Sequence, residues 1–161
     1  MTQPETTTGR AGKYLTFVLG GEDYGLEILK VREIMGMLGI TSVPNSPYHV
    51  KGVVNIRGKV IAIVDLRAKF GMPEAEYTDE TCIIVVYVGQ VEVGIIVDRV
   101  SEVMDIAEDD IEDAPELGTD IDTHAILGMS KAGGKVTILL DINKVLGGDQ
   151  MMAETECLET V

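Results

Sequence analysis

The sequence predicts an all-β protein with minor helix, built from two small β-barrels that are related by internal duplication. Three observations lead to this prediction. β-branched residues dominate the apolar runs, which favours strands. The runs are short and separated by glycine-bearing turns, with few helical periods between them. The same pattern of segments also occurs twice along the chain. Strongly bent strands in so small a unit fit a closed barrel, because closure removes exposed sheet edges.

The duplication is clearest when Val50–Arg67 is compared with Ile126–Asn143. The second copy keeps several turn and strand-end positions: Gly52 returns as Gly128, Gly58 as Gly134, Lys59 as Lys135 and Asp65 as Asp141. It does not keep Asn55 or Arg57, which lysine and glycine replace. Positions that both copies keep are interpreted as scaffold, and positions that only the first copy has are candidates for function.

A second matching pair, Thr16–Met35 and Val85–Met104, extends the duplication over most of the chain. We therefore expect one domain over residues 13–148, with a first subdomain at about 13–80 and a second at about 81–148. Each subdomain is close to the lower size limit for an independent core, so the two should bury apolar surface against each other.

The elements of each unit follow from local pattern. In the first unit we expect strands at Lys13–Leu19 and Tyr24–Ile28 around a glycine turn, a helical turn at Lys30–Met37, a strand at Ile40–Val43 ended by Pro44–Pro47, strands at Val50–Asn55 and Lys59–Leu66, and a short helix at Leu66–Phe70. The second unit repeats the hairpin and the helical turn over Thr81–Met104, and the short helix over Ile142–Leu146. Asp65 and Asp141 each end a strand, so both are expected to cap the helix or turn that follows.

Four segments are expected to lie outside the barrels. Residues 1–12 are polar and rich in threonine, which predicts a disordered arm. Pro73–Glu80 is an acidic linker between the halves. Asp105–Asp122 holds many carboxylates and few apolar residues, and because it lacks the calcium-loop pattern we expect a solvated linker. Residues 149–161 form an acidic tail or a short helix.

Composition narrows the classes of function. The formal net charge of −14 argues against nucleic acid and anionic membranes as partners, and solubility is its simplest explanation. Cys82 and Cys157 are the only cysteines and lie in no disulfide framework or metal-binding pair, which indicates a reducing compartment. The apolar runs are far too short to span a membrane, and Met1–Gly12 does not resemble a signal peptide. The expectation is a cytoplasmic protein.

Catalytic and cofactor motifs are not found in the sequence. The only histidines are His49 and His124, and neither has a second histidine or a cysteine at ligand spacing. His124 lies near Asp120 and Asp122, which is a weak metal signal. Phosphate-binding, dinucleotide-binding and serine-nucleophile motifs do not occur. We expect a non-catalytic protein without a metal or another cofactor.

The motifs VPNSPYHVKGVVNIRGKVIAIVDLRAKFG, YGLEILKVREIM and VGIIVDRVSEVM together resemble the CheW family, the coupling proteins of bacterial chemotaxis arrays. The resemblance spans about Lys13–Leu146 and implies two SH3-like β-barrel subdomains. It implies an adaptor that couples the cytoplasmic tips of methyl-accepting chemoreceptors to the chemotaxis histidine kinase, through the regulatory domain of that kinase. Such a protein acts in the cytoplasm, at receptor arrays under the inner membrane, and ring assembly with the kinase regulatory domain is a further possibility.

The resemblance also implies a receptor-binding surface. A helical receptor tip would lie in an apolar groove between the barrels. The matching candidates are Val31, Glu33, Gly52, Asn55 and Arg57, with Ile83, Val100 and Val103 for the opposite wall. Among these, Asn55 and Arg57 have no counterpart in the other copy, and arginine is enriched at binding hot spots. Two alternatives stay open: a barrel that binds a small ligand, and a self-assembling double barrel without receptor contact.

Overall fold

The computed structural model describes residues 10–113 and 125–146. Its strands, in chain order, are β1 (Gly12–Leu19), β2 (Glu22–Glu27), β3 (Val31–Gly36), β4 (Val50–Ile56), β5 (Lys59–Asp65), β6 (Cys82–Val88), β7 (Val91–Val97), β8 (Arg99–Ile106), β9 (Ile111–Glu112), β10 (Ile126–Ser130) and β11 (Thr137–Leu140). The helical segments are the 3-10 turns η1 (Ile28–Lys30), η2 (Glu108–Asp110) and η4 (Ala132–Gly134), and the one-turn α-helices α2 (Leu66–Lys69) and α3 (Ile142–Val145). As expected, Asp65 and Asp141 cap the two α-helices with their carboxylates.

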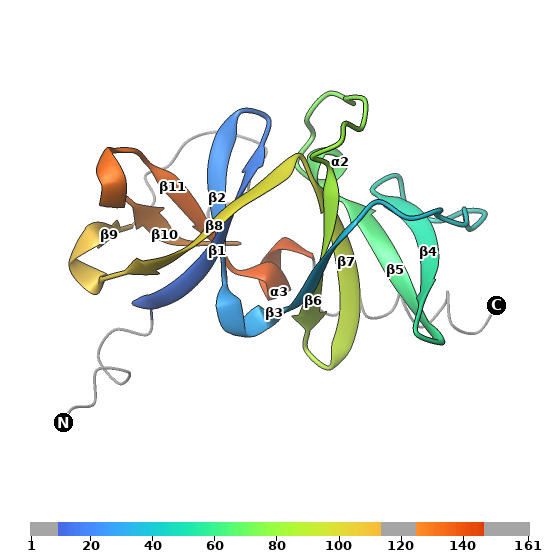
Figure 1. The fold of residues 1–161 in the computed structure, drawn as a ribbon, viewed down its shortest axis with the longest axis horizontal. Coiled ribbons are helices and arrows are strands. Elements are labelled where there is room, and N and C mark those ends of the chain that lie inside the picture. Colours follow the sequence, from blue (N-terminus) through green and yellow to red (C-terminus); the bar gives the residue numbers. More distant parts are fainter. Residues whose placement is uncertain (1–9, 114–124, 147–161) are drawn as a thin grey trace.

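The strands form two curved sheets that lie side by side (Figure 1). One sheet has 6 strands in the order β8-β1-β2-β11-β10-β9, and the other has 5 in the order β3-β6-β7-β5-β4. Each sheet curls around an apolar cluster of its own, so we call the larger sheet barrel 1 and the smaller sheet barrel 2. The predicted class, all-β with minor helix and two small barrels, is confirmed.

The two barrels do not correspond to the two halves of the sequence. Barrel 1 joins the hairpin β1–β2 of the first half to strands β8–β11 of the second, and barrel 2 joins β6–β7 of the second half to β3–β5 of the first. The expected boundaries at 13–80 and 81–148 therefore do not separate the barrels. Parallel pairing of β2 with β11 and of β7 with β5 produces the exchange. Under the duplication, the equivalent strands have the same order in both barrels, and β9 is an additional edge strand of barrel 1.

A shared core explains why the exchanged hairpins are apolar on both faces. Alternate residues of β6 point in opposite directions: Ile83 and Val85 belong to the core of barrel 2, whereas Ile84 and Val86 belong to a larger cluster between the barrels. Phe17 from β1 joins the same central cluster. The barrels thus bury apolar surface against each other, as their small size led us to expect.

Two equivalent ion pairs show the role of the lysines that both copies keep, Lys59 and Lys135. In barrel 2, Lys59 Nζ lies 3.0 Å from Glu92 Oε2, and in barrel 1, Lys135 Nζ lies 2.9 Å from Asp23 Oδ2. Each pair joins the last hairpin of one half to the exchanged hairpin of the other. The interpretation of these lysines as scaffold agrees with this geometry.

The helical turn expected at Lys30–Met37 is wrong. Only η1 is helical there, and Val31–Gly36 forms strand β3, which pairs with β6. The pairing of this strand with β6 shifts register between Val31 and Glu33, so Val31 and Ile34 face the central cluster and Met35 faces the core of barrel 2. The apolar spacing that suggested a helix therefore belongs to a bulged strand. The equivalent residues of the second half form β8. The strand expected at Ile40–Val43 is reduced to one bridge, between Thr41 and Val53.

The acidic run and the amino-terminal arm are more ordered than expected. Ile106 and Ile111 are buried in the core of barrel 1, so the first part of Asp105–Asp122 is not a solvated linker. Arg10 bonds Glu108 and Asp113, each at 2.9 Å, which ties down the last residues of the expected arm. The rest of the arm, residues 114–124 with His124, and the tail 149–161 with Cys157 lie outside the described residues.

Candidate partner-binding surface

The turn between β4 and β5 presents Arg57 to solvent. Arg57 and Gly58 have φ angles of 53° and 83°, as in the type I′ turns that match the twist of a two-residue hairpin. The Asn55 side chain accepts a hydrogen bond from the Gly58 N–H at 2.8 Å. Asn55 therefore stabilises the turn. This role explains why asparagine stands two residues before Arg57, and it needs no contact with a binding partner.

Arg57 forms an ion pair with Glu33 on β3, so the structure brings two of the predicted site residues together. Strands β3 and β4 are the two edges of barrel 2, and the ion pair connects edges that share no ladder. The side chains are 61% and 26% exposed, so both remain accessible to a partner. The equivalent positions in barrel 1 are Glu102 and Gly133, which cannot make this pair.

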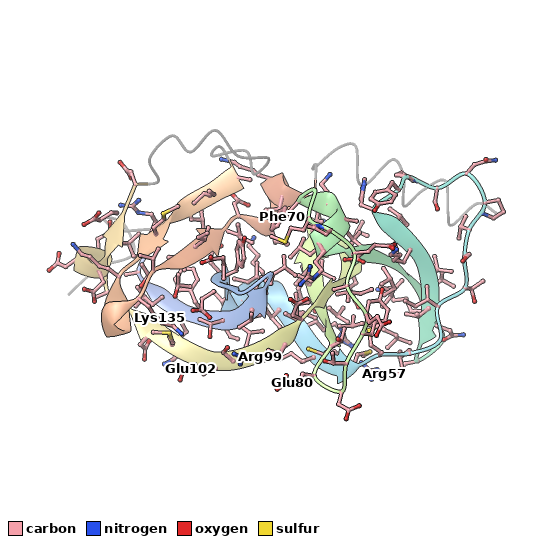
Figure 2. All side chains as sticks on the ribbon, turned by 90° about the horizontal axis from the view of Figure 1, so that it is seen from above. Arg57, Phe70, Glu80, Arg99, Glu102 and Lys135 are labelled. Atoms are coloured by element: carbon pink, nitrogen blue, oxygen red, sulfur yellow. The ribbon has the colours of Figure 1, made fainter. Side chains whose placement is uncertain are left out.

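Strands β3 and β8 carry most of the other predicted residues, and both views place these strands on one side of the molecule (Figures 1 and 2). Val31 and Val100 occupy equivalent positions and pack partly against the central core. Val103 is 51% exposed. The sequence interpretation missed its counterpart Ile34, which is 45% exposed, although the duplication pairs the two residues. These four residues form an apolar surface from both barrels, on the faces of β3 and β8 that are turned towards the central cluster. Glu33 pairs with Val85 of the barrel 2 core, so it meets Arg57 on the other face of β3.

Two predicted residues are not on this surface. Ile83 is fully buried in the core of barrel 2, so its expected place on the wall of a groove is wrong. Gly52 is buried where the chain around Thr41 crosses β4, and a Cβ atom there would lie 2.1 Å from the Thr41 carbonyl oxygen. Gly128 is equivalent, since a Cβ atom would lie 3.0 Å from the Glu112 carbonyl oxygen. Gly52 is a packing residue.

A second exposed feature lies at η1. Leu29 is 87% exposed, beside a shallow pocket that Tyr14, Glu27 and Ile28 help to line. Burial raises the pKa of Glu27, and Lys30 opposes that shift. Glu27 and Lys13 are the charged residues of its lining, and this shallow, open pocket offers few convergent groups to a small ligand.

Within residues 10–113 and 125–146, no group of three or more histidine, cysteine or acidic side chains is placed to hold a metal ion. In the same part of the chain, no helix has the length and apolar character needed to cross a bilayer.

The fold and the surface define a double-barrel protein whose candidate site is suited to binding another protein. The family model described as CheW-like domain matches residues 13–150. The chemotaxis protein CheW of Klebsiella aerogenes is 41% identical over 139 residues, which covers 86% of this chain and 84% of the relative. The chemotaxis protein CheW of Bacillus subtilis is 36% identical over 143 residues, covering 88% and 90%.

A solved structure agrees with these relatives. The crystal structure of the scaffolding protein TtCheW from Thermoanaerobacter tengcongensis superposes with a TM-score of 0.79 at 34% identity, covering 86% of this chain and 94% of that one. The chain therefore belongs to the CheW-like family.

Proposed function

We propose that this protein is a non-catalytic adaptor that couples the cytoplasmic tips of chemoreceptors to the chemotaxis histidine kinase. The observation that carries the proposal is the surface over β3 and β8, where apolar side chains come from both barrels and the exposed Arg57–Glu33 pair lies on the neighbouring face of β3. The relatives are named chemotaxis proteins, and the similar solved structure is described as a scaffolding protein. The adaptor acts in the cytoplasm, at receptor arrays under the inner membrane.

The surface suits a helical partner. An amphipathic helix binds by laying its apolar face into a hydrophobic groove, and charged groups at the rim set its orientation. Val31 and Val100 supply apolar area from the two barrels, and the exposed residues Ile34 and Val103 extend it. Arg57 can donate further hydrogen bonds to a carboxylate of the partner, because only one of its nitrogens contacts Glu33.

The second partner in the proposal is the kinase, through its regulatory domain. Because the two barrels have the same strand order, a domain with the same barrel can pack on either of two equivalent faces. Such contacts can also close into rings that contain both proteins.

The test is size-exclusion chromatography with a receptor cytoplasmic fragment and with the kinase regulatory domain, each at micromolar concentration. Co-elution with each partner is expected. Arg57→Ala should reduce co-elution with the receptor fragment. The matched control is Lys135→Ala, which removes an equally exposed ion pair from barrel 1. If the wild-type protein co-elutes with neither partner, the proposal is wrong, and assembly with itself alone would favour the self-assembling alternative.

A further inference from the structure

The chain passes between the barrels at two equivalent crossovers. Asp98 lies between β7 of barrel 2 and β8 of barrel 1, and η1 lies between β2 of barrel 1 and β3 of barrel 2. In the aligned copies Asp98 occupies the position of Leu29. The strands that follow the two crossovers, β8 and β3, carry the proposed binding surface. The geometry at the crossovers therefore determines how the two walls of that surface are placed.

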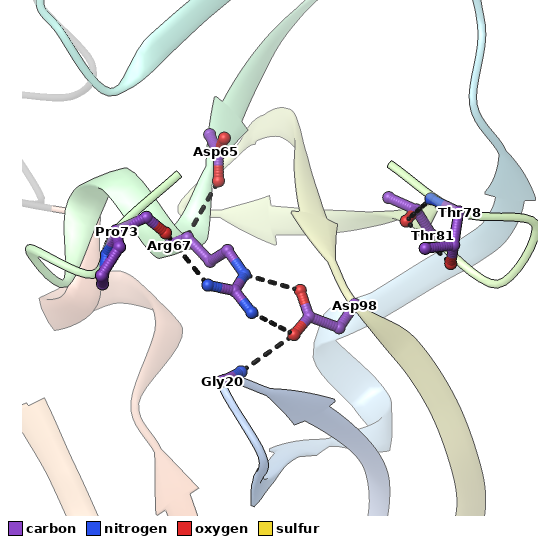
Figure 3. Close-up of polar contacts among 7 residues, drawn as sticks. All are labelled: Gly20, Asp65, Arg67, Pro73, Thr78, Thr81 and Asp98. Atoms are coloured by element: carbon purple, nitrogen blue, oxygen red, sulfur yellow. Dashed lines mark hydrogen bonds and ion pairs between the residues drawn. The ribbon is translucent and has the colours of Figure 1, made fainter. Parts of the chain in front are cut away.

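Asp98 is held at the first crossover from both barrels (Figure 3). Its two carboxylate oxygens accept hydrogen bonds from Nε and Nη2 of Arg67, both at 2.9 Å. Arg67 belongs to α2, which follows β5 of barrel 2. The same carboxylate accepts from the Gly20 N–H at 2.9 Å, and Gly20 is in the β1–β2 turn of barrel 1. The Asp98 N–H donates to the Val18 carbonyl at 3.1 Å.

Arg67 is itself fixed by its remaining contacts. Its Nη1 donates to the Pro73 carbonyl at 3.0 Å, and its backbone N–H donates to Asp65, which caps α2. A guanidinium with all three nitrogens engaged has little freedom to rotate, and a bidentate pair defines an orientation that a single contact does not. We call the contacts of Arg67, Asp98 and Gly20 the clamp.

The ionisation of the clamp is consistent with this geometry. Burial alone would raise the pKa of Asp98, but hydrogen bonds from Arg67 and from the Gly20 N–H outweigh it and the net shift is downward. The hydrogen bond from Arg67 to Asp98 raises the pKa of Arg67. Both groups are charged at neutral pH.

The second crossover has a weaker connection. There the Gly89 N–H, equivalent to that of Gly20, donates directly to the neutral Asn143 side chain at 3.2 Å. Leu29, in the place of Asp98, is 87% exposed and cannot form an ion pair. Within residues 10–113 and 125–146, the first crossover thus has three charge-assisted hydrogen bonds to Asp98, whereas the equivalent place at the second has one neutral hydrogen bond.

We infer that Arg67 and Asp98 are positioning residues that hold the two barrels in one relative orientation and so keep β3 and β8 aligned for a partner. The expected effect of the clamp on receptor binding rests on the proposed function, whereas its expected effect on the orientation of the barrels does not. Loss of the clamp should widen the range of orientations of β8 relative to β3 over the shared core, because apolar packing is non-directional whereas the hydrogen bonds of the clamp are directional.

The experiment measures the distance between the barrels by electron–electron double resonance. Spin labels are placed at Val60→Cys in barrel 2 and Val136→Cys in barrel 1, two exposed and equivalent positions, with Cys82 and Cys157 replaced by serine. Asp98→Asn keeps an acceptor for Gly20 but removes the charge. The matched control is Asp23→Asn, which breaks the ion pair with Lys135 inside barrel 1. If Asp98→Asn folds poorly, Arg67→Lys keeps the charge and loses the bidentate geometry.

We expect Asp98→Asn to broaden the distance distribution about twofold and Asp23→Asn to leave it unchanged. Affinity for the receptor fragment should fall about fivefold in Asp98→Asn, with a smaller fall in Arg67→Lys. Equal distributions for Asp98→Asn and Asp23→Asn would overturn the inference. A broadened distribution with unchanged affinity would refute the role in binding. If the wild-type protein binds no receptor fragment, the proposed function fails, and the distances still decide whether the clamp orients the barrels.

Discussion

Replacing Arg57 by glycine should leave the stability of the protein almost unchanged while it weakens partner binding. Arg57 has a φ angle of 53°, a conformation that costs a non-glycine residue about 1 kcal/mol or more. The second copy has Gly133 at the equivalent place, with a φ angle of 79°. The first copy thus carries an arginine at a position whose backbone favours glycine, and the partner binding proposed above would explain why it is there.

The magnitude follows from three opposing terms. Relief of the backbone strain stabilises Arg57→Gly by about 1 kcal/mol. Loss of the largely exposed pair with Glu33 costs about 0.2–1 kcal/mol. The greater freedom of glycine in the unfolded chain costs about 0.4–1 kcal/mol. The free energy of unfolding should therefore change by less than about 1 kcal/mol.

Urea denaturation followed by far-ultraviolet circular dichroism measures this change, and it needs no tryptophan, which the chain lacks. The reciprocal variant Gly133→Arg is the control, and its free energy of unfolding should also change by less than about 1 kcal/mol, because the same strain and unfolded-chain terms oppose each other. Titration calorimetry with the receptor fragment should show a lower affinity for Arg57→Gly and an unchanged affinity for Gly133→Arg. A destabilisation of Arg57→Gly beyond about 2 kcal/mol would refute the reasoning, because it would show that the ion pair is needed to close barrel 2.

Two further predictions concern stability. Gly52→Ala should destabilise the protein by more than about 3 kcal/mol in the same denaturation assay, because its Cβ would lie 2.1 Å from the Thr41 carbonyl oxygen and the φ angle of 147° disfavours alanine. A loss below about 1 kcal/mol would show that the chain around Thr41 can move away from β4. Burial raises the pKa of Tyr14 to about 12, and its hydroxyl donates to the Arg10 carbonyl. The neutral phenol is thus favoured in the fold, so stability should be intact below pH 10 and fall by about 2–3 kcal/mol as the pH rises towards 12. Tyr14→Phe should flatten that fall, and an equally steep fall in the variant would contradict the assignment.

Local features were predicted well from the sequence because they depend on neighbouring residues. Strand β5 and helix α2 follow from an apolar run that ends at Asp65, whose carboxylate caps the helix. The comparison of the copies correctly marked Lys59 and Gly52 as scaffold, and the ion pair with Glu92 and the close approach of Thr41 give the reasons.

The comparison of the two copies was misleading where a difference between them reflects the local backbone and not partner binding. Asn55 has no counterpart, which suggested function, yet it bonds Gly58 within a turn that the second copy builds differently. Glu33 has the counterpart Glu102, which argued for scaffold, yet only Glu33 meets an arginine. A difference between copies therefore identifies a change in structure or in binding, and contacts are needed to separate the two.

By itself the sequence determined the hairpin strands, the glycine turns, the two helix caps and the duplication, but not strands β3 and β8, because alternation, turn propensity and capping act over a few residues. Only the tertiary structure decided which hairpin completes which barrel, since β2 pairs with β11 and β7 with β5 across the two halves. It also decided the contacts of Arg57 with Glu33, Arg67 with Asp98, and Gly20 with Asp98, whose members are 24, 31 and 78 residues apart. Local sequence patterns do not predict contacts between residues so far apart in the chain, because these contacts form only when the sheets close and the shared core packs.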